Sequence, residues 1–205
     1  GEAHARYIEV ADALADANFK DEKVQGYLDR SRATLVYEPG KILFEHGHVE
    51  EARARLLKVI ERWPRKNVGA FAAEMIVTSY QDAGDLKNMR VWGGKFARMQ
   101  LGEDSELKQL EFAGKAEWAA FNMAQQLRDS GENEEAAQAY VDFMTEFPKS
   151  EYLKQAHKNA AYTHKDLGRL ERANELFLDF VTRIENGQYK NSGKDWAIYD
   201  MIASN

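Results

Sequence analysis

The sequence predicts an all-α fold in which similar helix-turn-helix units stack into an α-solenoid of about 10–11 helices. Turn glycines recur at positions 47, 84, 131 and 168, so the steps between them are 37, 47 and 37 residues. Apolar residues recur with helical spacing between these glycines, and the 205 residues include only three prolines. A period of this size indicates one supersecondary unit per repeat, each burying its apolar face against the next.

A first helix is predicted over residues 3–17, before the repeats begin. Tyr7, Ala11 and Leu14 fall on one stripe of this helix, with charged residues between them. This spacing is typical of an amphipathic helix.

The next segment is predicted to contain two helices separated at a proline. Asp21 is a suitable N-cap for a helix that runs to about Val36. Proline fits the first turn of a helix and not its interior. We therefore expect a separate short helix from Pro39 to about His46.

Each turn glycine is followed by acidic residues, in most units by a small residue, and then by an apolar stripe with i, i+4, i+7 spacing. The acidic residues are Glu50, Glu51, Asp85, Glu134, Glu135 and Glu171; the small residues are Ala52, Ala136 and Ala173; the stripe contains Leu56, Val59, Tyr140, Phe143, Phe177 and Phe180. Carboxylates in the first turn of a helix are favoured by its macrodipole. Because their placement recurs from unit to unit, we interpret them as helix-stabilising rather than as a catalytic pair.

The ends of the predicted helices are marked by prolines and by the turn glycines. Pro64 and Pro148 each end the second helix of a unit, because the residue before proline is disfavoured in α conformation. Ser150 is a candidate cap for the helix that follows. The first helices of three units are predicted at 70–81, 117–128 and 154–165.

This unit, with glycine at the turn, an acidic pair, alanine, an aromatic residue and a terminal proline, resembles the tetratricopeptide repeat (TPR). The resemblance covers about residues 33–186 and is closest from Gly131 to Pro148, whereas the unit after Gly84 matches poorly. It implies a right-handed α-solenoid whose first helices line a concave groove for a protein or peptide partner. The 37-residue step is longer than the usual repeat of about 34. In this longer unit and in the segment Phe-Pro-Lys-Ser at 147–150, the sequence is similar to periplasmic TPR proteins of Gram-negative envelope machines. Examples are outer-membrane assembly lipoproteins, the Tol-Pal coordinator, and myxobacterial gliding and pilus proteins.

The predicted organisation has five parts. They are an N-terminal helical pair at 1–38, TPR-like repeats at 39–101, a helical extension at 102–116, TPR-like repeats at 117–186, and a capping helix or further repeat at 187–205. Trp196, Ile198, Tyr199 and Ile202 are the apolar residues of the last part. The two ends of the sequence look like those of a fragment cut from a longer chain.

Two departures from the repeat lie between Gly84 and Gly131. Gly93 and Gly94 fall inside a predicted helix, where each costs about 1 kcal/mol relative to alanine. We expect a close helix crossing or a kink there, with a ligand notch as the alternative. The 47-residue step adds ten residues, which predicts one long helix over about 105–130. The addition lengthens the helix by about 15 Å.

The resemblance places the partner groove on the first helices of successive units. The candidate groove residues are Phe71, Trp118, Phe121, Gln125, Arg128, Lys158, Asn159 and Tyr162. Aromatic residues and arginine are common anchors of protein interfaces. Lys158 and Asn159 resemble part of the carboxylate clamp of some repeats, but Tyr162 stands where the clamp's second asparagine would be. A solvated face with packing aromatics is the alternative for this set.

The composition limits the chemistry that this chain can perform. A net charge of −6 and a pI near 5.5 argue against a nucleic-acid partner, which needs a basic face. The absence of cysteine excludes disulfides, cysteine-ligated zinc and thiol nucleophiles, and it favours an envelope or secreted setting. The five histidines lack i, i+4 spacing, no nucleophile motif occurs, and no apolar run is long enough to insert into a membrane. We therefore predict no catalytic residues, no metal and no cofactor.

These observations predict a non-enzymatic scaffold that binds a protein or peptide. We expect it in a bacterial envelope assembly or motility machine, in the periplasm or cell envelope; the alternative location is the cytoplasm. Two other functions stay open: a regulatory or substrate-positioning domain of a larger enzyme, and a self-assembling structural spacer that uses 102–116 as a dimer contact. The sequence leaves the oligomeric state open.

Overall fold

The computed structural model describes residues 2–193, 195 and 198, and this part of the chain is helical without any strand. The helices are α1 (Glu2–Ala15), α2 (Glu22–Glu45), α3 (Val49–Arg62), α4 (Asn67–Asp82), α5 (Leu86–Phe96), α6 (Ser105–Asp129), α7 (Asn133–Glu146), α8 (Leu153–Asp166) and α9 (Leu170–Glu185). None of the described helices is long and apolar enough to cross a membrane.

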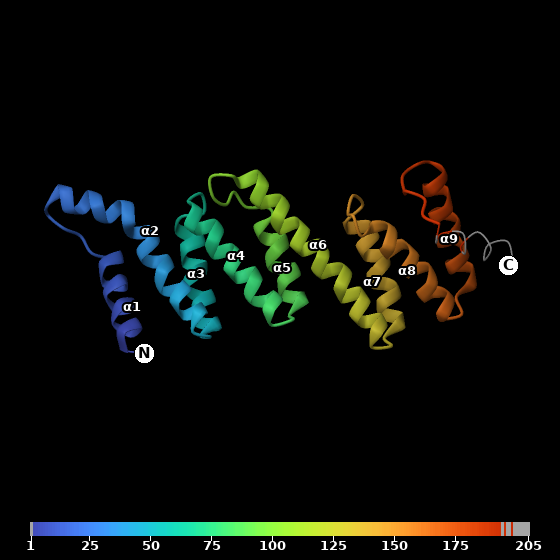
Figure 1. Cartoon of the computed structure of the whole chain (residues 1–205), viewed down its shortest axis with the longest axis horizontal. Helices are drawn as coiled ribbons and strands as arrows, with labels where there is room; N and C mark the ends of the chain where they lie inside the picture. The colour runs from blue at the N-terminus through green and yellow to red at the C-terminus, as the bar shows by residue number, and fades with distance from the viewer. Residues whose placement is uncertain (1, 194, 196–197, 199–205) are drawn as a thin grey trace. The chain divides into compact units, whose positions relative to one another are not determined.

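The chain divides into two compact units, residues 1–116 and 117–205. In the first unit α1 packs against α2, α2 against α3, α3 against α4, and α4 against α5 (Figure 1). In the second unit α8 packs between α7 and α9. These antiparallel hairpins confirm the all-α, TPR-like fold. The five-part subdivision and the handedness of a solenoid stay predictions.

Within the described residues there are nine helices instead of the predicted 10–11, for two reasons. The segments at 22–36 and 39–46 form one helix, α2. The predicted C-terminal helix falls within 187–205, where 194, 196–197 and 199–205, including Trp196, Tyr199 and Ile202, lie outside the described residues. The extra residues after Gly84 belong to α6, a single helix over the stretch for which the sequence predicted one.

The turn glycines end their helices with a recurrent pair of hydrogen bonds. Gly131 has a φ of 84°, its N–H donates to the carbonyl of Arg128, and the N–H of Glu132 donates to the carbonyl of Leu127. Gly168, with a φ of 73°, has the same pattern. This is the Schellman motif, which satisfies carbonyls at the end of one helix and reverses the chain toward the next.

Helix α2 contradicts the predicted break at proline. Asp21 caps its N-terminus as expected, because one carboxylate oxygen accepts from the backbone N–H groups of Lys23 and Val24. The helix then continues through Pro39, so the separate helix predicted from Pro39 is wrong. Pro39 and Gly40 are buried, and a Cβ on Gly40 would lie 3.1 Å from the Leu56 side chain. Packing against α3 therefore offsets the roughly 3 kcal/mol cost of an interior proline.

Helices α5 and α6 cross closely at Gly93, as predicted. A Cβ at Gly93 would lie 3.1 Å from the carbonyl oxygen of Phe112 and 3.2 Å from the backbone nitrogen of Ala116. Gly94 is not part of this crossing, because an added Cβ there would meet only the Arg98 guanidinium at 3.8 Å. Of these two glycines, only Gly93 is required by the packing of α5 against α6.

The second unit has a continuous core that is rich in aromatic rings and alanine. Its buried members include Phe121, Tyr140, Phe143, Phe177 and Phe180, with alanines from α6 to α9 filling the gaps between the helices. Small residues let helices approach closely, and each aromatic ring buries a large apolar surface. This core fixes the position of α8 in the unit.

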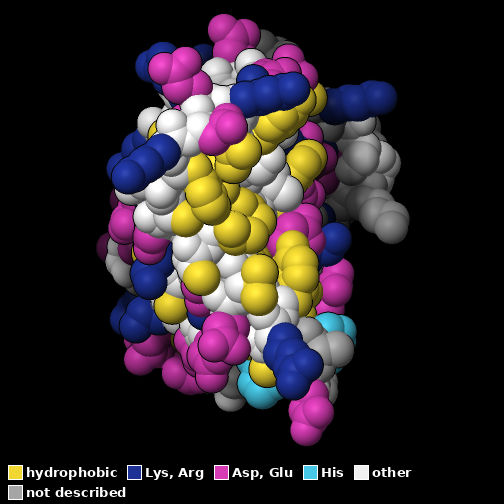
Figure 2. Space-filling model, turned by 90° about the vertical axis from the view of Figure 1, so that its left-hand side faces the viewer, with side chains coloured by type: hydrophobic (Ala, Val, Ile, Leu, Met, Phe, Trp, Pro, Cys, Tyr) yellow, Lys and Arg dark blue, Asp and Glu magenta, His cyan; other side chains and the backbone are white. Residues whose placement is uncertain are grey.

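The first unit leaves apolar side chains exposed on α1 and α2. Ala11 and Ala15 are buried, whereas Tyr7, on the same predicted stripe as Ala11, is 43% exposed. Apolar side chains flanked by charged ones are visible on this face (Figure 2). The exposed large hydrophobic residues of α1, α2 and their connection are Tyr7, Val10, Phe19, Val24 and Tyr27.

Candidate binding site on helix α8

Helix α8 presents one small, buried side and one polar, accessible side. Ala156, Ala160 and Ala161 are completely buried, which allows close packing against α7 and α9. Gln155 is exposed, and Lys158 is half-buried. The sequence predicted that Ser150 caps α8, but it does not occupy the cap position. Its hydroxyl oxygen accepts from the N–H of Tyr152, the residue that immediately precedes the helix.

An open cleft of about 340 Å³ lies along the first two turns of α8. It is lined by Glu151, Lys154, Gln155, Lys158, Ser192 and Asp195. One wall is therefore α8, and the other is the segment that follows α9.

The second wall is held in place by a buried carboxylate. Asp195 is 1% exposed and accepts from the Lys154 ammonium at 2.7 Å and from the backbone N–H and hydroxyl of Ser192. Burial alone would raise the pKa of Asp195, but these hydrogen bonds outweigh it, so the pKa lies below its ordinary value. Lys154 also donates to the carbonyl of Lys190 at 2.6 Å. The charge of Lys154 is thus used to fix the wall of the cleft.

Lys158 is the available cation of this cleft. Among the described residues, no carboxylate lies within 4 Å of its ammonium group, whereas Lys154 in the same cleft is paired. The polar side chains beside Lys158 are hydrogen-bonded to each other: the Gln155 amide donates to the side-chain oxygen of Asn159 at 2.8 Å. A ligand carboxylate could therefore approach Lys158 without displacing an internal ion pair.

The other predicted groove residues of the second unit differ in how accessible their side chains are to a partner. Trp118 is half-buried, and Gln125 is exposed. Arg128 lies 3.7 Å from the Asp166 carboxylate, so its charge is already paired with the end of α8. Tyr162 is half-buried and packs edge-on against Phe177, with 5.2 Å between ring centroids.

Phe121 and Asn159 are buried, which corrects their predicted exposure on a groove. Phe121 is 8% exposed and stacks on Tyr152, with 5.1 Å between ring centroids. Asn159 is 7% exposed and is satisfied by Gln155. Both side chains are therefore buried in the second unit and are not available on an open surface.

Phe71 belongs to the first unit and is considered apart from the α8 cleft. Its side chain is 47% exposed on α4. Within the first unit, its helix is tied to α6 by the Lys108 ammonium, 3.7 Å from the Glu74 carboxylate.

His157 is a core residue that links α8 to α9. Its Nε2–H donates to the carbonyl of Leu176 at 2.9 Å, which leaves Nδ1 to accept from the Tyr189 hydroxyl at 3.2 Å. Burial lowers its pKa to about 4, although Asp179 lies 3.6 Å from Nε2. Nowhere in the described residues do three or more histidine or acidic side chains gather in a way that could hold a metal ion.

Sequence reasoning missed Lys154, Ser192 and Asp195. A local signal was present, because Ser192 and Asp195 have the Ser-x-x-acid spacing of a capping box. The pairing with Lys154 could not be found in this way, since 41 residues separate it from Asp195.

Comparison with known proteins gives a limited result. No protein-family model and no curated protein matches the chain. Among solved structures, MamA MSR-1 is similar at a TM-score of 0.32 and 16% identity, over 89% of this chain and 90% of that one. MamA AMB-1 is similar at a TM-score of 0.34 and 15% identity, over 93% of this chain and 87% of that one. At these values no residue role and no function is carried over to this chain.

Proposed function

We propose that this protein is a non-enzymatic scaffold that binds a segment of another protein in the cleft along α8. The observation that carries the proposal is the ammonium of Lys158, which forms no ion pair with any described residue, in an open cleft whose other lysine is held by Asp195. A half-buried lysine attracts a carboxylate more strongly than a fully solvated one, because less water screens the interaction.

The ligand that fits this cleft is a peptide with a carboxylate, either a C-terminus or an acidic side chain. Its carboxylate would pair with Lys158, and the exposed amide of Gln155 could exchange its bond to Asn159 for one to the peptide. Tyr162, one turn beyond Lys158, offers an aromatic ring for an adjacent apolar side chain. Each of these contacts is of a kind common in protein interfaces.

Fluorescence anisotropy with a library of short synthetic peptides tests this proposal. Each peptide is measured with a free C-terminal carboxylate and as its amide, against wild type, Lys158→Met and the matched control Lys87→Met. Lys87 is exposed on α5 in the other unit. We expect acidic or carboxylate-terminated peptides to bind wild type and the control, and to lose about tenfold or more in affinity with Lys158→Met. Equal affinities for all three proteins would refute the site.

We further propose that the scaffold works in a bacterial envelope assembly or motility machine, in the periplasm or cell envelope. This rests on the resemblance of its 37-residue units to periplasmic TPR proteins and on the absence of cysteine. Fractionation of the cells that make the protein, with protease added to the opened envelope, tests it. Recovery in the cytosol, protected from protease, would exclude this location.

Self-association through α6 is a second candidate function, favoured by a specific observation. Leu107 and Leu110 are 57% and 72% exposed and lie one turn apart on α6. Large apolar side chains on an accessible helix face are common in dimer contacts. Light scattering should show a lower mass for Leu107→Gln/Leu110→Gln than for the control Leu170→Gln/Leu178→Gln, which alters two exposed leucines of α9. A wild-type mass equal to one chain would exclude this role.

A further inference from the structure

A second cleft, of about 570 Å³, separates α1 from α3 in the first unit. Its two long walls carry opposite charges. Asp12 and Asp16 lie on the α1 side, whereas Arg55, Lys58 and Arg62 lie on the α3 side, together with one carboxylate, Glu51, near the start of α3. The spacing of the three basic residues places them along one face of α3, which we call the basic strip.

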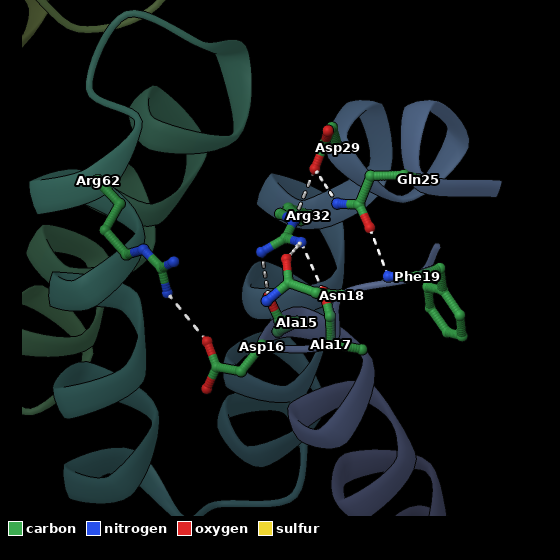
Figure 3. Close-up of polar contacts among 9 residues, drawn as sticks. All are labelled: Ala15, Asp16, Ala17, Asn18, Phe19, Gln25, Asp29, Arg32 and Arg62. Carbon is green, nitrogen blue, oxygen red and sulfur yellow. Dashed lines mark hydrogen bonds and ion pairs between the residues drawn. The ribbon is translucent and has the colours of Figure 1, made fainter. Parts of the chain in front are cut away.

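Ion pairs connect the two walls. The Arg55 guanidinium binds both carboxylate oxygens of Asp12, at 2.7 and 2.8 Å. Arg62 faces Asp16 at 3.9 Å across the cleft (Figure 3). The hydrogen bonds from Arg55 hold the pKa of Asp12 below its ordinary value. Lys58 lines the same wall and makes no ion pair within 4 Å among the described residues.

Little apolar burial holds α1 in place. Its buried side chains in the described part are Ala11 and Ala15, which contribute only methyl groups. Ile8 and Leu14 are half-buried, and Tyr7 and Val10 are exposed. The ion pairs are partly solvent-exposed, with the Asp16 side chain at 82%. Such pairs are weak and are screened by salt. Helix α1 thus packs against α2, and the ion pairs connect it to α3.

The C-terminal end of α1, which carries Asp12 and precedes Asp16, is also bound to α2 by hydrogen bonds. The Arg32 guanidinium on α2 donates to the carbonyls of Ala15 at 3.1 Å and Ala17 at 2.7 Å (Figure 3). A released α1 would thus stay attached and remain at a high effective concentration near the basic strip.

We propose that the basic strip is a docking surface for an acidic helical segment of a partner protein, and that α1 occupies it as an internal competitor in the free protein. The geometry of α1 shows what such a segment needs, namely two carboxylates one helical turn apart. This inference goes beyond the function proposed above, because it concerns the other unit and a different set of residues.

Binding of an acidic helix in trans tests the proposal. The probe is a fluorescein-labelled peptide with residues 2–20 of this chain, which carries both carboxylates. In Asp12→Lys/Asp16→Lys, repulsion by the basic strip should displace α1, and the probe should bind about tenfold or more tightly than to wild type. A further Arg55→Glu/Lys58→Glu change should abolish this gain.

Two controls separate the specific effect from general attraction between charges. Asp82→Lys/Glu185→Lys makes the same change in net charge at two exposed helix ends outside the cleft. It should bind the probe no better than wild type, and a probe with Asp12→Asn and Asp16→Asn should bind neither variant. Equal gains in both variants, or equal gains for a DNA oligonucleotide of similar charge, would overturn the proposal.

A measurement on wild type covers the case in which the charge-reversed variant fails to fold. Hydrogen exchange of α1 should quicken between about 50 and 500 mM salt, because screening weakens its ion pairs, while α3 to α5 should stay protected. Unchanged protection of α1 would show that charge does not hold it, and the proposal would be wrong.

Discussion

Acidification should destabilise the second unit through His157. This side chain is completely buried and has a pKa of about 4 in the folded protein, against an ordinary value of 6.5. Between these two values the unfolded chain binds a proton that the folded chain does not. The free energy of unfolding is therefore highest above about pH 6.5 and falls as the pH drops through this window toward 4.

The size of this effect follows from the two pKa values. At about pH 4.5 the unfolded histidine is almost fully protonated, whereas the folded one is protonated to about a quarter. With these two pKa values, the free energy of unfolding at about pH 4.5 is lower than at neutral pH by about 2.5 kcal/mol. Solvent does not screen the imidazole of His157 in the folded protein, because this side chain has no exposed surface.

Urea unfolding at about pH 7 and about pH 4.5 measures this loss, with His157→Gln as the control that cannot titrate. Glutamine keeps a donor for the Leu176 carbonyl, and its own cost is the same at both pH values. Hydrogen exchange on α8 and α9 identifies the transition that belongs to this unit. Parallel pH dependence of wild type and variant, or an NMR titration of His157 near 6.5, would refute the reasoning.

Three further predictions concern packing, capping and the cleft wall. Gly93→Ala should lower the free energy of unfolding by about 1–3 kcal/mol, because its Cβ would press on the α6 backbone, whereas Gly94→Ala should raise it by up to about 1 kcal/mol. Asp85→Ala should cost about 1 kcal/mol in urea unfolding, since it removes the cap on α5. Asp195→Asn should cost about 1–3 kcal/mol and speed hydrogen exchange after α9, because the charge-assisted bond from Lys154 is lost; unchanged exchange would contradict this.

The sequence predicted the features that depend on neighbouring residues. The turn at Gly131 and the helix end before Pro148 each follow from backbone preferences within a few positions. The crossing at Gly93 was also accessible, because an interior glycine without local benefit indicates a close neighbour. The sequence did not predict the features that depend on packing between distant residues. Pro39 stays inside α2, where it is buried and α2 packs against α3 at the neighbouring Gly40, and no local rule contains this packing.

The candidate site shows the same division. Lys158 was selected from the resemblance to the repeat family, and its role in binding stays a prediction. The burial of Phe121 and Asn159 was missed, because the rotation of a helix about its axis is set by its neighbours. The second wall of the cleft was missed because Asp195 reaches α8 across 41 residues of chain.

The turn glycines have a consequence for the chemistry of the chain. At Gly131 and Gly168 the backbone takes a positive φ. A D-amino acid prefers this conformation, because it is the mirror image of the one that L-residues prefer. D-alanine at either position should adopt this backbone conformation without strain, and it should stabilise the fold by restricting the unfolded chain. The boundary between the two helices of a unit is thus specified by the handedness of a single residue, which chemical synthesis could write into the chain directly.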